Sequence, residues 1–159
     1  MPMLSSLIKS ADWKAEKHVP VITVHSPSPA SPFLVPHSPI EIEVSVGKEI
    51  PHPNTLEHHI AWAALYFVAD GSQLPVELAR TEFRAHGPDL FTTPVLKATV
   101  ALPTPLTPTP TPTPTQTLSL LSGTLHAVAY CNIHGLWESN RPIAVVGPVR
   151  QIERTLFGG

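Results

Sequence analysis

Proline is the residue that most constrains how this chain can fold. The 159 residues include 20 prolines, of which five lie between 26 and 39 and six lie between 103 and 114. Proline lacks a backbone N–H and has a fixed φ, so it interrupts both helix interiors and sheet ladders. We therefore interpret the stretches at about 26–39 and 103–116 as proline-rich loop insertions within one domain that spans residues 1–159.

Outside these two stretches the pattern is typical of β-structure. Ile40, Ile42, Val44 and Val46 alternate with more polar residues, which predicts a strand with one buried face. Valine, aromatic residues and threonine predict further strands at 19–25, 60–69, 76–86, 96–102 and 123–130. Six or seven short strands, without a capped helical segment of adequate length, predict an all-β antiparallel sandwich.

Charge and hydropathy argue against a nucleic-acid-binding protein and against a membrane-spanning one. The formal net charge is −2 with only ten lysines and arginines, whereas a nucleic-acid-binding protein needs a concentrated basic face. The longest apolar stretch, 60–69, is ten residues long, half of the roughly 20 that span a membrane. The first residues lack the basic and apolar regions of a secretory signal, so we expect a cytoplasmic protein.

The lone cysteine, Cys131, precedes His134 by three residues. A single thiolate beside an imidazole is typical of a metal ligand or a nucleophile, and a free thiolate is safest in a reducing compartment. His18, His52 and His58 lie upstream, the last two being six residues apart. Four imidazoles and one thiolate suit iron, copper or zinc and disfavour magnesium and calcium.

Three motifs in this order resemble the superoxide reductase family, which includes the neelaredoxins and desulfoferrodoxins. They are Glu-Lys-His-Val-Pro at 16–20, His-Pro-Asn-Thr-Leu-Glu-His-His at 52–59 and Cys-Asn-Ile-His-Gly-Leu-Trp at 131–137. The resemblance covers about residues 10–138. It implies an immunoglobulin-like antiparallel β-sandwich of about seven strands. It also implies one mononuclear non-heme iron (Fe2+/Fe3+), ligated by His18, His52, His58, His134 and, opposite an open position, Cys131.

The resemblance further implies the one-electron reduction of superoxide to hydrogen peroxide, with iron re-reduced by rubredoxin or another small electron carrier. Glu16 would swing into the open position, and Lys17 would attract the anionic substrate and help to deliver protons, with Lys48 a weaker second candidate for attraction. Two-iron relatives carry an extra domain with four cysteines, so one cysteine indicates the one-iron type. Relatives of that type are tetramers or dimers, so we expect a homo-oligomer.

Two other functions are compatible with a sandwich of this kind. The first is a blue-copper electron-transfer protein, although such sites usually have an axial methionine near the last histidine, and Met1 and Met3 are at the other end of the chain. The second is a non-catalytic interaction module that displays the proline-rich loops. The remaining histidines match no ligand position of the family pattern and are expected at the surface or in packing: His25, His37, His59, His86 and His126.

Overall fold

A computed structural model describes residues 1–25, 34–102 and 118–148 of the chain. A short 3-10 helix, η1 (Leu4–Ser6), precedes seven strands. The strands are β1 (Pro20–His25), β2 (Pro39–Val46), β3 (Ile60–Ala69), β4 (Val76–Glu82), β5 (Val95–Ala101), β6 (Leu118–Cys131) and β7 (Gly135–Pro148). No helix within the described residues is long and apolar enough to cross a membrane.

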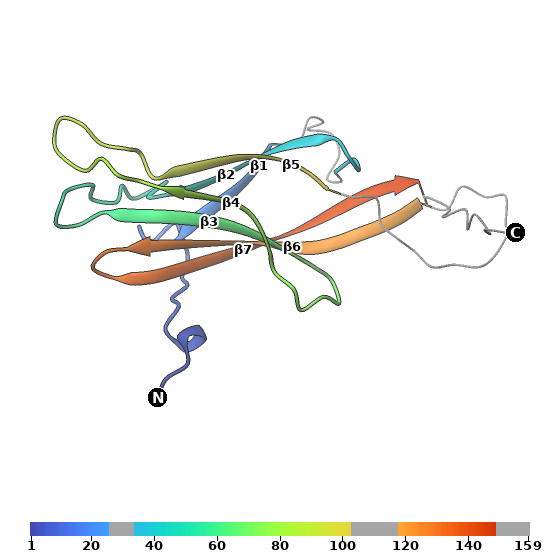
Figure 1. The fold of residues 1–159 in the computed structure, drawn as a ribbon, viewed down its shortest axis with the longest axis horizontal. Coiled ribbons are helices and arrows are strands. Elements are labelled where there is room, and N and C mark those ends of the chain that lie inside the picture. The colour runs from blue at the N-terminus through green and yellow to red at the C-terminus, as the bar shows by residue number, and fades with distance from the viewer. Residues whose placement is uncertain (26–33, 103–117, 149–159) are drawn as a thin grey trace, which may run out of the picture.

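The strands form two layers, as Figure 1 shows. One sheet has the order β1-β2-β5 and the other has the order β4-β3-β6-β7, and all of the pairs are antiparallel. An immunoglobulin constant-type sandwich also divides seven strands between sheets of four and three. Here the fourth strand pairs with the third, so it joins the sheet of β6 and β7. The predicted immunoglobulin-like sandwich is confirmed.

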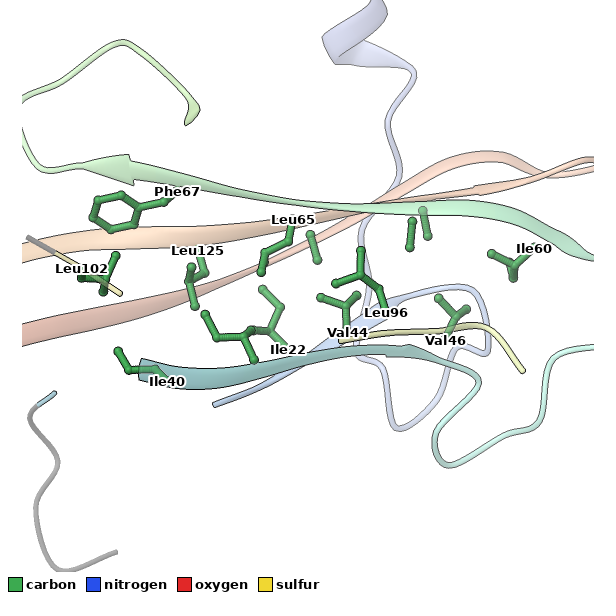
Figure 2. Close-up of a cluster of buried hydrophobic side chains, with 14 of the residues drawn as sticks. Ile22, Ile40, Val44, Val46, Ile60, Leu65, Phe67, Leu96, Leu102 and Leu125 are labelled. Carbon is green, nitrogen blue, oxygen red and sulfur yellow. The ribbon is translucent and has the colours of Figure 1, made fainter. Parts of the chain in front are cut away.

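Alternating side chains explain why β2 forms the centre of its sheet. Ile40, Ile42 and Val44 are at most 1% exposed, whereas Glu41 on the other face is exposed. Leu65 and Leu125 belong to the same buried cluster and come from the opposite sheet, and Figure 2 shows them meeting Ile40 and Val44 between the layers. The apolar core therefore joins the two sheets.

The sequence prediction missed β7. Its residues 138–142 read Glu-Ser-Asn-Arg-Pro and lack an apolar alternation. The structure explains why polar residues suit this strand. Ser139 Oγ donates to the Pro20 carbonyl at 2.5 Å, and an Arg141 Nη1 donates to the Ile22 carbonyl at 3.0 Å. Both side chains donate hydrogen bonds to backbone carbonyls of β1, which is the edge strand of the other sheet. They therefore connect the two edge strands, β1 and β7.

Other predicted boundaries shift by a few residues. The predicted strand 76–86 ends at Glu82, and the predicted strand 123–130 extends from Leu118 to Cys131. The end of the first proline-rich stretch is ordered, because Leu34 is buried and bridges to Val145 of β7. The rest of that stretch (26–33) and all of 103–116 lie outside the described residues.

Three connections lie at one end of the sandwich. They are the β2–β3 connection, the β4–β5 connection and the β6–β7 turn, on the left in Figure 1. Hydrogen bonds join them: the Asn132 backbone N–H donates to the His59 carbonyl at 3.2 Å, and the Asn54 amide donates to the Thr92 carbonyl at 3.0 Å. Residues distant in sequence can therefore converge here.

Candidate metal centre

The five predicted ligands come from three segments. His18 lies two residues before β1, while His52 and His58 lie in the β2–β3 connection. Cys131 is the last residue of β6, and His134 follows in the β6–β7 turn. Because β3 begins at Ile60, His58 belongs to the connecting loop and not to the strand.

Four of these residues form a compact cluster. One ligand atom from each of His18, His58, Cys131 and His134 lies within 4.8 Å of the others. The His18 Nε2 and His134 Nδ1 atoms are 2.9 Å apart, and Cys131 Sγ is 3.5 Å from the same His134 nitrogen. The cysteine is fully buried. One sulfur atom and three imidazoles, from the segment before β1, the β2–β3 connection and the end of β6 with its turn, thus lie close together.

His52 lies beside this cluster. Its ring centroid is 4.8 Å from that of His18 and 4.7 Å from that of His58. The Nδ1–H group of His52 donates a hydrogen bond to the Pro53 carbonyl at 2.6 Å. That bond leaves Nε2 with a lone pair. The neighbouring prolines, Pro51 and Pro53, restrict the loop that presents the ring.

Two buried ring nitrogens without a partner in the described ranges indicate that these residues could bind a metal ion. The Nε2 atoms of His52 and His58 are buried and have no hydrogen-bond partner within the described part of the chain. An unpaired buried polar atom destabilises a fold, and coordination would remove that penalty. Burial lowers the pKa of His52 to about 4 and lowers the pKa of His58 as well. Both rings are therefore neutral near pH 7, the state that binds a metal. The residues fit a transition-metal ion such as iron.

Glu16 fixes the orientation of His18. Its Oε1 atom accepts hydrogen bonds from the His18 Nδ1 at 2.5 Å and from the His18 backbone N–H at 3.2 Å. The side-chain bond lowers the pKa of Glu16, so the residue is a carboxylate. A carboxylate on one ring nitrogen sets the tautomer and makes the other a better ligand. His18 Nε2 is then the nitrogen that faces the cluster.

Asn132 ties the cysteine turn to the histidine loop, and no sequence signal beyond its place next to Cys131 indicates this role. Its Nδ2 donates to the Glu57 carbonyl at 2.9 Å, and its Oδ1 accepts from the His59 backbone N–H at 2.9 Å. These bonds bracket His58 on both sides. The distance between His58 and Cys131 is therefore set by one side chain as well as by the strands.

Two histidines outside the cluster have a packing role, as the sequence indicated. The rings of His59 and His86 stack with their centroids 3.6 Å apart. A ring nitrogen of His86 bonds to the Asn54 side-chain oxygen at 2.7 Å. Asn54 follows His52 by two residues, so these contacts hold the β4–β5 connection against the loop that carries the ligands.

Trp137 forms one wall of the cluster. Its ring stacks on that of His18, with centroids 4.9 Å apart and planes inclined by 15°. The indole is half-buried, and its Nε1 has no hydrogen-bond partner among the described residues. An aromatic face at this place packs on the His18 ring and restrains it.

The two candidate steering lysines differ in their surroundings. Lys17 adjoins His18, and its charge adds to burial in lowering the pKa of His52 and of His58. Its ammonium therefore acts on the cluster. Lys48 is exposed and donates to the Thr23 hydroxyl of β1 at 3.2 Å. The charge of Lys48 is thus held toward the β1 strand.

Comparisons with known proteins agree with this geometry. Residues 10–140 match the family model for desulfoferrodoxin. A superoxide reductase from Pyrococcus horikoshii is 44% identical over 137 residues, which cover 86% of this chain and 96% of the relative. The neelaredoxin of Megalodesulfovibrio gigas is 35% identical over 150 residues, covering 89% of this chain and 98% of the relative.

A solved structure gives the same result for the fold. The reduced superoxide reductase (neelaredoxin) of Archaeoglobus fulgidus superposes with a TM-score of 0.65 at 40% identity, covering 86% of this chain and 98% of that one. Both the family match and these relatives extend over nearly all of the sandwich. The chain therefore belongs to the desulfoferrodoxin family, the family of the superoxide reductases and neelaredoxins.

Proposed function

We propose that this protein is a superoxide reductase that converts superoxide to hydrogen peroxide by one-electron reduction at a single iron. The observation that carries the proposal is the buried cluster of imidazoles and one thiolate, in which two imidazole nitrogens have no partner. The proposed ligands are His18, His52, His58 and His134 through nitrogen and Cys131 through sulfur. Superoxide takes up one electron and two protons to give hydrogen peroxide.

Iron in this site would supply that electron and cycle between its ferrous and ferric forms. The protein's own residues would attract the substrate and help to supply its protons. Lys17 would attract the anion, since a local positive field raises the rate of encounter even in a chain of net charge −2. It would also help solvent protons reach the substrate.

Glu16 would have two functions. In the structure its carboxylate holds the His18 ring, which secures the tautomer that the ligand needs. Its partly exposed side chain would also leave His18 and move toward the open side of the centre once substrate has departed. The first function rests on the observed contact, and the second rests on the resemblance to the family.

The environment of the centre supports further expectations. A single buried thiol suits a reducing compartment, so we place the protein in the cytoplasm, where a rubredoxin-like or other small carrier would re-reduce it. We also expect a homo-oligomer, a tetramer or a dimer.

A blue-copper site is disfavoured, because Met1 and Met3 are both strongly exposed, whereas an axial methionine would be buried at the metal.

Metal analysis with absorption spectroscopy tests the proposal. Aerobically purified protein should contain one iron per chain and show a thiolate-to-iron band. Cys131→Ser should abolish that band, because oxygen is a poorer electron donor to ferric iron than sulfur. Stoichiometric copper with a strong blue band, or a band and full iron content that survive Cys131→Ser, would refute the assignment.

A further inference from the structure

The N-terminal segment extends the sheet at β7 and brings a lysine to the candidate metal centre. The Lys9 backbone N–H donates to the Leu136 carbonyl at 3.0 Å, and the Glu138 N–H donates to the Lys9 carbonyl at 2.8 Å. Lys9 and Trp137 thereby form a parallel bridge. Because both backbone groups of Lys9 are paired, its side chain starts from a fixed position.

That side chain contacts two parts of the centre at once. The Lys9 ammonium donates to the backbone carbonyl of His134 at 3.1 Å. It also lies 5.4 Å from the centroid of the Trp137 ring, within the range of a cation–π contact. Trp137 in turn stacks on His18. One ammonium therefore contacts both the turn that presents His134 and the ring that packs on His18.

We propose that Lys9 is a positioning residue of the metal centre, an inference that rests on the proposed function. Its bond to the His134 carbonyl holds the β6–β7 turn in the conformation that points Nδ1 at the cluster. Its contact with Trp137 holds the indole against His18. Its positive charge also favours the ferrous state over the ferric state, because the ferrous ion carries less positive charge.

Lys14 provides a matched control. It lies in the same N-terminal segment, is exposed, and places its ammonium 5.6 Å from the centroid of the Trp13 ring. The two lysines thus make similar contacts with an indole. Among their contacts in the structure, the bond to the ligand turn belongs to Lys9.

The test compares full-length wild-type protein with Lys9→Gln, Lys9→Arg and Lys14→Gln. Two quantities are measured: the midpoint potential, followed by the thiolate-to-iron band, and the affinity of the metal-free protein for Co2+, followed by absorption. We expect Lys9→Gln to lower the midpoint potential and to weaken Co2+ binding by about tenfold, the lower end of the effect of removing a residue that supports metal ligands. Lys9→Arg should retain both values, and Lys14→Gln should match the wild type.

The outcomes separate this inference from the proposed function. If Lys9→Gln has the potential and the Co2+ affinity of the wild type, Lys9 does not position the centre. If Lys9→Arg is impaired as severely as Lys9→Gln, the residue acts through packing and the inference is wrong. A wild-type protein that binds iron without a thiolate band would overturn the proposed function itself, and the inference with it.

Discussion

Gly47 lies so close to His52 that a Cβ atom at position 47 would be 2.6 Å from the His52 backbone nitrogen. Gly47 is the first residue after β2, and its φ is +78°, a conformation that residues with a Cβ rarely adopt. The close approach fixes where the β2–β3 connection leaves the sheet. A glycine outside the cluster therefore helps to determine where a predicted ligand lies.

Gly47→Ala should displace the His52 loop. Gly71→Ala is the control, because Gly71 has nearly the same φ of +77° but a Cβ there would meet no atom within 4 Å. Backbone strain alone should lower the free energy of unfolding by about 1 kcal/mol in both variants. Only Gly47→Ala should also reduce the iron content, measured by metal analysis. Equal iron content in the two variants would show that the loop adapts without cost.

The apolar core between the two sheets determines the stability of the sandwich. Leu125 of β6 is fully buried against the opposite sheet, whereas Leu74 is 70% exposed in the β3–β4 connection. Leu125→Ala should lower the free energy of unfolding by about 2–5 kcal/mol, because it leaves a cavity. Leu74→Ala should change it by less than about 0.5 kcal/mol. Denaturant unfolding monitored by tryptophan fluorescence measures both, and similar values for the two variants would contradict this packing.

Much of the fold was predictable because its strands carry local signals. The alternation at Ile40–Val46 and the apolar run at 60–69 report burial directly, so β2 and β3 lie where predicted. The strand β7 was not predictable in this way. Its polar residues Ser139 and Arg141 bond to carbonyls of β1, a contact between segments more than 100 residues apart. Such long-range pairing leaves no local pattern.

The sequence predicted which residue types form the candidate site, but not the contacts that hold them in place. Ordered motifs predicted a set of ligands, and the structure brings four of those residues together: His18, His58, Cys131 and His134. The supporting contacts could not be read in the same way. Asn132 is an ordinary turn residue in sequence, and its bonds to the loop around His58 depend on how two connections meet. The roles of Glu16 and Lys17 remain predictions, and so does metal binding by all five proposed ligands.

Acid should destabilise the metal-free protein. Burial lowers the pKa of His52 from its ordinary value of 6.5 to about 4 and also lowers the pKa of His18 and His58. Between these pH values the unfolded chain binds more protons than the folded chain. The contribution of these neutral imidazoles to the free energy of unfolding is therefore fully present above about pH 6.5 and is lost as the pH falls toward 4.

Thermal unfolding of the metal-free protein measures this loss. The melting temperature should fall between pH 7 and pH 5 and should fall less steeply in His52→Gln. His25→Gln is the control, because His25 is exposed at the end of β1. A melting temperature that stays constant or rises on acidification would mean that these imidazoles are not held neutral by burial.

Lys17 and Glu16 should be separable by kinetics. Superoxide is an anion, so a positive charge beside the centre accelerates its arrival, and this effect is screened by salt. Lys17→Ala should slow the bimolecular reduction of superoxide by about tenfold at low ionic strength and flatten its salt dependence. Glu16→Ala should leave that step near the wild-type rate and change the absorption spectrum of the resting ferric protein, because the His18 ring loses its carboxylate partner.

Pulse radiolysis at two salt concentrations distinguishes these effects, with Lys14→Ala as the control. Lys14 is an exposed lysine in the same segment, three residues before Lys17, so its removal changes the net charge by the same amount. A general effect of net charge would slow both lysine variants equally, whereas local steering would slow Lys17→Ala alone. A wild-type rate and salt dependence in Lys17→Ala would instead make Lys17 an ordinary solvated charge, and the electrostatic part of the proposed mechanism would then have to be abandoned.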